Sequence, residues 1–204
     1  MEELRVLEKP DWISWDDVQK CIHDAQLTNT TKGFDMSFGH QTGAELCEKV
    51  GDGYCFVVLN EKNAVVGTIT LKVMDIKSWW HRGSAGYHCF EAISPDYRGT
   101  DAYFDMHAHL IKKEKQLGLK VIYADTAEKN KVILKASKKT GWKHVQFTTF
   151  QGCDYYSIYL VKWYDTCPFS DRYINFMFKL SKVIIKIIYK PGRINRLTNW
   201  IKIQ

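Results

Sequence analysis

The sequence lacks the features that mark several specialised classes of protein. It has no Cys-x-x-Cys pair, and its six cysteines have no spacing with histidine that would assemble a zinc site. No uncharged run approaches the length of a membrane-spanning helix. The N-terminal Met-Glu-Glu-Leu-Arg is followed by no apolar segment of the kind that directs export. We therefore expect reduced thiols, no bound metal and a cytoplasmic protein.

Excess positive charge is absent from most of the chain. The formal net charge is +6 at pH 7, but from Pro168 to Gln204 eight Lys or Arg residues stand against Asp171 alone, a net +7. The remainder therefore carries −1. A nucleic-acid-binding domain usually carries its basic patch on the folded body, so we expect no nucleic-acid partner.

The hydrophobic pattern predicts a folded α/β domain. The sequence predicts a hairpin over residues 54–74, in which Ile69, Leu71 and Val73 alternate with polar residues, and a strand over residues 87–94. Residues 102–118 have helical spacing instead. The predicted order of elements is β-α-α-β-β-β-α-β-α-β-β, which favours a mixed sheet with helices on both faces. The other predicted elements are strands over residues 4–8, 121–124, 143–150 and 155–164, and helices beginning near Ser14, Thr42 and Lys129.

Three short motifs follow one another along the chain. In the first, Asn63–Ile69, a glycine follows two apolar residues at a hairpin entry. The second is the strand-to-loop stretch Ile93-Ser94-Pro95-Asp96-Tyr97-Arg98-Gly99. In the third, Asn130 is followed eleven residues later by Gly141-Trp142. All three resemble motifs of the Gcn5-related N-acetyltransferase (GNAT) family. Their order and spacing carry the resemblance, which covers roughly residues 3 to 164.

The resemblance implies a fold and a reaction. The fold is that of an acyl-CoA N-acyltransferase, α/β with a central mixed, mostly antiparallel sheet flanked by helices. We expect this domain over residues 1–166, and a basic, amphipathic helical extension over residues 167–204. The implied reaction moves an acetyl group from acetyl-CoA to an amine, and we expect a small primary amine as acceptor.

The loop that opens the Ala102 helix is the expected acetyl-CoA site. A glycine loop entering a helix turns backbone N–H groups toward a pyrophosphate. The family loop continues R-G-x-G-x-G/A, whereas Asp101 and Tyr103 replace two of its glycines here. Asp101 either caps the helix and competes with phosphate, or points toward Arg98 or Lys112. The expected cofactor-binding residues are Ile93, Arg98, Gly99, Thr100, Asp101, Ala102, Tyr103 and, from the resemblance, Asn130.

The implied reaction needs an oxyanion donor and a base. By resemblance the donor is the backbone N–H of Ile93. Glu91 is the only acid on that strand and, by alternation, lies on the same face as Ile93, with His88 on the opposite face. If Glu91 is buried, its apolar neighbours in the sequence predict a raised pKa, which suits a general base. A cross-strand ion pair is the alternative role for Glu91.

The reaction also needs an acid that protonates the leaving thiolate. Many family members use a tyrosine where this chain has Ser137, and a hydroxyl of serine is a much poorer proton donor. Tyr123, Tyr156 and Tyr159 are the candidates to replace it. We take Tyr159 as the catalytic candidate, with water as an equal alternative.

Two other functions stay open at this point. The replacements at Asp101, Tyr103 and Ser137 suit a GNAT-shaped binding or regulatory protein without turnover, and a longer acyl donor suits an enzyme at a membrane surface. The tail supports the second idea. At 100° per residue a helix from Arg172 to Lys190 gathers its cations in about 80° and leaves a broad apolar face. The body, a second copy, or a bilayer must cover that face, so residues 172–203 predict a homodimer or a peripheral membrane contact.

Overall fold

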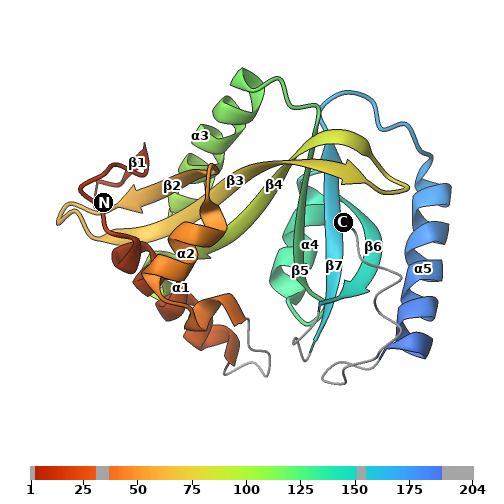
Figure 1. The fold of residues 1–204 in the computed structure, drawn as a ribbon, viewed down its shortest axis with the longest axis horizontal. Helices are drawn as coiled ribbons and strands as arrows, with labels where there is room; N and C mark the ends of the chain where they lie inside the picture. The colour runs from red at the N-terminus through yellow and green to blue at the C-terminus, as the bar shows by residue number, and fades with distance from the viewer. Residues whose placement is uncertain (1–2, 31–36, 151–154, 190–204) are drawn as a thin grey trace. The chain divides into compact units, whose positions relative to one another are not determined.

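The computed structural model describes residues 3–30, 37–150 and 155–189 (Figure 1). The chain divides into two compact units, which we describe separately. Unit 1 contains Met1–Val73 and Gly86–Leu119, and unit 2 contains Met74–Ala85 and Lys120–Gln204. Strands β3 (Val65–Lys77) and β4 (Arg82–Ile93) contribute to both units.

Unit 1 holds the first four strands as neighbours in chain order, β1 to β4. Strand β1 (Arg5–Glu8) pairs antiparallel with β2 (Tyr54–Leu59), and β2 pairs antiparallel with β3. The helical elements of this unit are α1 (Trp15–Thr30), η1 (Ser37–His40), α2 (Gly43–Val50), η2 (Pro95–Tyr97) and α3 (Ala102–Gln116).

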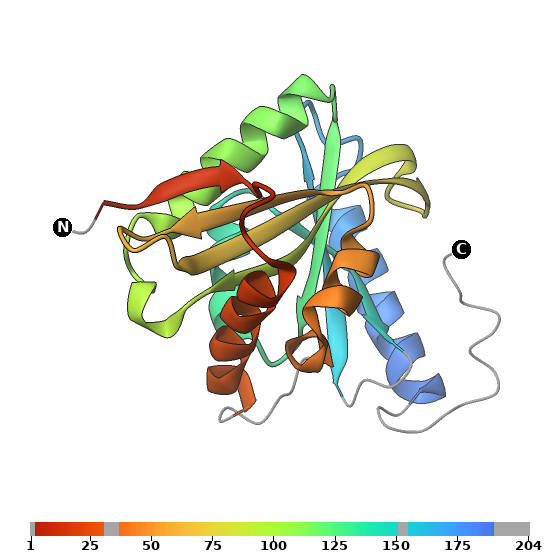
Figure 2. The ribbon, with the colours of Figure 1, turned by 60° about the vertical axis from the view of Figure 1, so that its left-hand side comes forward.

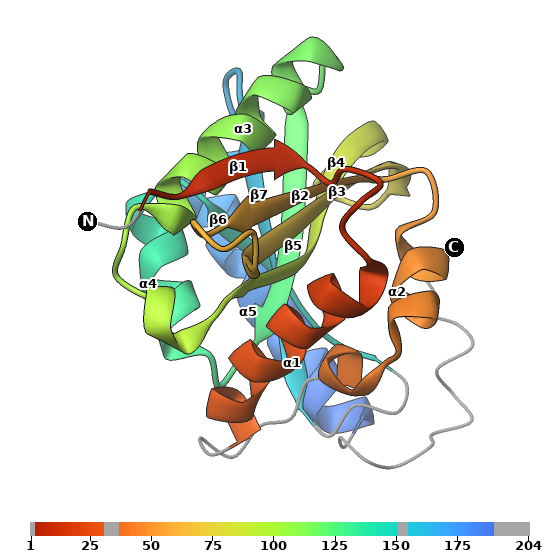
Figure 3. The same cartoon turned by 90° about the vertical axis from the view of Figure 1, so that its left-hand side faces the viewer.

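The strands of unit 1 are covered by helices on both faces (Figures 2 and 3). Because successive side chains of a strand point to opposite faces, Val57 packs toward α1 and α2, whereas Phe56 and Val58 pack toward α3. The α1/α2 side is filled by Val18, Ile22, Leu46 and Val50, and the α3 side by Met106 and Leu110. The predicted placement of helices on both faces is confirmed.

Unit 2 contains three further strands with β7 (Tyr156–Trp163) between β5 (Val121–Ala127) and β6 (Lys143–Thr149). Both pairings are antiparallel. Helix α4 (Lys131–Lys139) and helix α5 (Asp171–Ile188) pack against the same cluster, around Phe147 and Leu160. Figure 1 shows α5 running beside β6.

The predicted order of elements is confirmed through all seven strands, and so is the α/β fold class with mostly antiparallel pairing. The tail helix forms as well. It begins at Asp171, after the N-cap residue Ser170, whose hydroxyl accepts a hydrogen bond from Tyr173 N. Residues 190–204 lie outside the described part of the chain. Among the helices that are described, none is long and apolar enough to cross a membrane. The domain boundary at residue 166 stays a prediction.

Candidate active site

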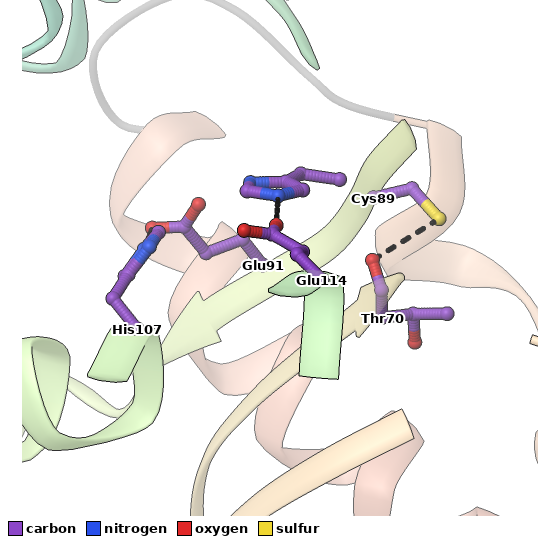
Figure 4. A network of polar contacts seen from close by, with 6 residues as sticks. Thr70, Cys89, Glu91, His107 and Glu114 are labelled. Atoms are coloured by element: carbon purple, nitrogen blue, oxygen red, sulfur yellow. Dashed lines mark hydrogen bonds and ion pairs between the residues drawn. The ribbon is translucent and has the colours of Figure 1, made fainter. Parts of the chain in front are cut away.

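Strand β4 changes its alternation near its C-terminal end. Phe90 has a φ of 52°, a left-handed backbone that is uncommon for a residue with a bulky side chain. Its ring packs on the α1/α2 side of unit 1. His88 and Glu91 both face α3 instead, where each meets a side chain of that helix (Figure 4). The prediction that His88 and Glu91 lie on opposite faces is therefore wrong, because the left-handed residue shifts the pattern as a β-bulge does.

Glu91 forms an ion pair with α3. His107 Nε2 lies 3.4 Å from Glu91 Oε1, and the Glu91 side chain keeps 32% of its surface exposed. Burial raises the pKa of Glu91, but the facing His107, by charge and hydrogen bond, and the charge of His88 outweigh it and hold that pKa below its usual value. The predicted raised pKa is wrong for this reason. The carboxylate is ionised at neutral pH and is open enough to accept a proton.

A second carboxylate on the α3 side of β4 is fully buried. Glu114 on α3 has no exposed surface, and its Oε1 pairs with His88 Nε2 (Figure 4). Sequence reasoning missed this residue. The signal was available, since Ala102, Met106, Leu110 and Glu114 follow each other at intervals of four and all lie on the buried face of α3. A carboxylate that continues an apolar series needs a buried partner.

Tyr103 extends this network at the first turn of α3. Its ring lies 4.3 Å from the ring of His107. Burial raises the pKa of the Tyr103 hydroxyl, and the charge of Glu91 raises it further. Tyr103 therefore holds its proton at neutral pH, and it packs beside the pair formed by Glu91 and His107.

The motif residues Gly67 and Ile93 are linked by packing. A Cβ at position 67 would lie 2.8 Å from Ile93 Cδ1 and 2.9 Å from Val58 Cγ2, so only glycine fits there without a shift. The Ile93 side chain joins the cluster on the α3 side. The prediction that Ile93 and Glu91 share a face of β4 is confirmed.

The guanidinium of Arg98 is bound to the protein itself. It donates to Ala25 O at 2.9 Å and to Thr28 Oγ1 at 2.7 Å on α1, and to Ile93 O at 3.3 Å. These bonds tie the loop to the end of β4 and to α1. A cofactor contact at Arg98 stays a prediction, and it would have to come from the backbone or from a rearranged side chain.

The start of α3 leaves several backbone donors open. Asp101 stands at the N-cap position but its carboxylate makes no capping bond. Thr100 Oγ1 accepts from Ala102 N at 3.3 Å instead. Within the described residues, the N–H groups at positions 99, 101, 103 and 104 have no hydrogen-bond partner. Gly99 has a φ of 85° and open space where a side chain would stand.

Two predicted site residues belong to unit 2. Asn130 caps α4, since its side chain accepts from Ile133 N and donates to Thr126 Oγ1 at 3.2 Å. Tyr159 lies opposite Asp125 in the pairing of β5 with β7. Burial raises the pKa of Tyr159, as does the charge of Asp125. Their predicted contacts with cofactor and substrate stay predictions.

Ser137, the residue at the family's tyrosine position, is buried on α4. Its hydroxyl donates to Leu134 O and lies 3.1 Å from His144 Nε2. Burial, aided by the charge of Lys138, lowers the pKa of His144 to about 4. The imidazole is therefore neutral at pH 7.

Metal binding is another chemistry that histidine, cysteine and acidic side chains can support. Across the described ranges, no group of three such side chains is placed to hold a metal ion.

The sequence matches the model of the acetyltransferase (GNAT) family over residues 19–142, which is more than half of the chain. The chain belongs to the GNAT acetyltransferase family. This match spans α1 through α4 and includes the network of β4 and α3 together with the loop between them. The resemblance seen in the three motifs is confirmed.

Solved structures of GNAT proteins share this fold at low identity. A GNAT-family acetyltransferase from Streptococcus agalactiae is 16% identical, with a TM-score of 0.63 over 80% of this chain and 96% of that one. A putative acetyltransferase from Acinetobacter baylyi is 14% identical, with a TM-score of 0.60 over 84% and 97%. A putative acetyltransferase from Salmonella typhimurium, solved with its cofactor acetyl-CoA, is 13% identical, with a TM-score of 0.54 over 82% and 98%. No curated protein matches the sequence.

Proposed function

We propose that this GNAT protein transfers an acetyl group from acetyl-CoA to a small primary amine by direct attack of the amine on the thioester. The observation that carries the proposal is the junction of β4 with α3. An ionised carboxylate, Glu91, stands two residues before Ile93, and an open helix N-terminus follows within the same unit. A base and an anion-binding loop in this order are what the reaction requires.

The residues at the start of α3 fit the diphosphate of acetyl-CoA. Four backbone N–H groups between positions 99 and 104 are free of partners within the described chain, and the macrodipole of α3 adds positive potential there. Gly99 leaves room for a close approach. The carboxylate of Asp101 opposes an anion at this place, so we expect binding that is weaker than the loop would otherwise give.

Glu91 is the proposed general base. Acetyl-CoA supplies the activated thioester, and Glu91 takes the proton that the acceptor ammonium must lose. His107 holds the carboxylate in place and keeps it ionised. By family resemblance, the N–H of Ile93 donates to the carbonyl oxygen under attack. By the same resemblance, Tyr159 is the proposed proton donor to the leaving thiolate. Its hydroxyl is protonated at neutral pH, and its raised pKa makes it a weaker acid than an ordinary phenol.

Two measurements test this proposal. Isothermal titration calorimetry with acetyl-CoA should show binding to the purified chain. Release of free thiol should then follow when amino sugars, amino acids and polyamines are added one at a time. The regulatory alternative would be supported if acetyl-CoA binds but no amine causes release of free thiol. Propionyl-CoA and octanoyl-CoA, tested with the same amines, would then also have to release no thiol.

A further inference from the structure

Helix α5 turns one face toward the body of unit 2. Ile174 and Ile185 are buried on this face, and Ser181 Oγ accepts from Phe147 N on β6 at 2.9 Å. Lys182 Nζ donates to Glu128 Oε1 at 2.9 Å, and Lys186 lies 3.9 Å from the same oxygen. The side chains of Lys182 and Lys186 are therefore drawn toward the body, so the cations that gather in one sector of the helix do not all point away from it.

The opposite face of α5 is apolar and exposed. Its most open members are Phe176 at 58%, Val183 at 55% and Ile187 at 77% exposed. Nothing in the described part of the chain covers them. At 1.5 Å per residue this stripe is about 20 Å long. An apolar stripe of this size marks a contact with something outside the described chain. Its residues are Tyr173, Phe176, Leu180, Val183, Ile184 and Ile187.

The stripe is continuous with a cluster of aromatic residues at the start of α5. The ring of Trp79 lies 5.6 Å from that of Phe169 and 5.7 Å from that of Tyr173, and Trp163 lies 6.3 Å from Phe169. Tryptophan and tyrosine side chains favour the boundary between lipid and water, because each has an apolar body and a polar group.

A hollow of about 480 Å³ opens beside this cluster, and Trp79 and Phe169 contribute to its wall. Arg82, His81 and Lys120 also line it. Lys120 is paired with Asp165 at 3.2 Å, and Arg82 is exposed. Arg82 and tryptophan side chains thus line the same hollow, together with Asp165, which Lys120 neutralises. A guanidinium beside aromatic residues suits a phosphate of a lipid headgroup.

Charge decides between a bilayer and a second copy of the chain as the occupant. Residues 168–204 carry eight cations and one carboxylate, and Arg172 and Lys179 are exposed along the edge of the stripe. Two copies of α5 placed face to face would bring these like charges together. An anionic bilayer would attract them, at about 1 kcal/mol for each cation near the surface.

We propose that α5 and the aromatic cluster of Trp79, Trp163, Phe169 and Tyr173 form a surface that binds anionic membranes, with α5 lying flat in the headgroup region. The apolar stripe enters the boundary of the acyl chains, and the cations beside it meet the headgroups. This site lies in unit 2 and does not depend on the proposed acetyl transfer.

Vesicle sedimentation tests the surface. The whole chain should bind vesicles of phosphatidylglycerol and phosphatidylcholine, and it should bind pure phosphatidylcholine at least about tenfold more weakly. The double variant Phe176→Asp with Ile187→Asp should lose binding. The matched control is Phe104→Asp with Val132→Asp, which places the same charges at apolar residues of α3 and α4 that are 67% and 71% exposed. The control should bind as the wild type does.

A charge variant tests the electrostatic part. Arg172→Glu with Lys179→Glu should lower binding at least about tenfold and reduce its salt dependence. The control is Lys135→Glu with Lys139→Glu, at exposed positions of α4. It should change neither the binding to vesicles nor its salt dependence. Equal binding to both vesicle types, or no binding at low salt, would overturn the proposal. So would a dimer in analytical ultracentrifugation that Phe176→Asp with Ile187→Asp dissociates, because the stripe would then belong to a second copy.

Discussion

At the scale of single residues, the charge of Glu91 is set by histidines on two elements. His107 comes from α3 and His88 from the same strand, and both lower the pKa of Glu91. The carboxylate is therefore ionised at every pH above its lowered pKa. Glu91 is thus unprotonated throughout the neutral range, but its lowered pKa makes it a weaker base toward the acceptor ammonium than a carboxylate of ordinary pKa.

Glu91→Gln should lower kcat/KM on the order of 100-fold at neutral pH, because the amide cannot accept the proton. The loss should shrink at alkaline pH, where the acceptor amine is already deprotonated. Thiol release measured across pH checks this, with Glu48→Gln on the exposed side of α2 as control. If wild type and Glu91→Gln have profiles of the same shape, Glu91 is structural.

Asp101 offers a second test at this scale. Its carboxylate stands at the N-terminus of α3 without capping it. Asp101→Asn should tighten acetyl-CoA binding by roughly two- to fivefold, because a charge near a helix N-terminus is worth about 0.3 to 1 kcal/mol and this one repels the diphosphate. Calorimetry measures it, and Asp11→Asn, remote from α3 in sequence, should change nothing. Weaker binding in Asp101→Asn would mean that the loop does not hold the diphosphate.

At the scale of elements, β4 depends on the backbone of one residue. A left-handed backbone costs a residue with a Cβ about 1 to 2 kcal/mol, and Phe90 has this backbone near the C-terminal end of β4. Phe90→Ala and Phe90→Gly both remove the ring. We expect the glycine variant to be the more stable of the two by about 1 kcal/mol in urea unfolding.

The control for this comparison is Val73 on β3, where the alanine variant should be the more stable of the two. In a regular strand Val73→Gly should be less stable than Val73→Ala by roughly 0.5 to 1 kcal/mol. If Phe90→Gly and Phe90→Ala are equally stable, the left-handed backbone does not persist in solution.

The elements themselves were largely predictable from the sequence, but some of their side-chain directions were not. Alternation along β4 placed Glu91 and Ile93 on one face correctly and failed at His88. A positive φ at phenylalanine has no sequence signal, whereas glycine or asparagine would have suggested one. The helical spacing of the tail predicted α5. It could not predict that Lys182 turns toward Glu128, because that carboxylate is 54 residues away in the sequence.

The candidate site was also predictable only in part. The sequence motif predicted the loop after β4 and the glycine at position 67, and the structure explains that glycine by its close contact with Ile93. The histidine partners of both carboxylates were not found, because a contact between β4 and α3 depends on how the helix packs. The lowered pKa of Glu91 could not be foreseen without those partners.

At the scale of the whole molecule, His144 makes stability depend on pH. Its pKa is lowered from 6.5 to about 4 in the folded protein, so between these values the unfolded chain binds a proton that the folded chain does not. Stability should therefore fall as pH decreases from 6.5 toward 4. His144→Gln should flatten this part of the curve.

Urea midpoints measured at several pH values check this, with His109→Gln on the exposed side of α3 as control. The control should keep the slope of the wild type. If His144→Gln leaves the slope unchanged as well, other groups cause the acid sensitivity and the imidazole of His144 is not held neutral.

The buried pair of His88 and Glu114 restricts how this sequence can change over evolutionary time. Loss of one partner strands the other inside the protein, which costs about 3 to 5 kcal/mol, a large part of the 5 to 15 kcal/mol that holds a typical domain folded. Loss of both to apolar residues of similar volume can be nearly neutral. A lineage that carries this pair can thus lose it only by substituting both residues in close succession. We therefore expect positions 88 and 114 to covary among its descendants.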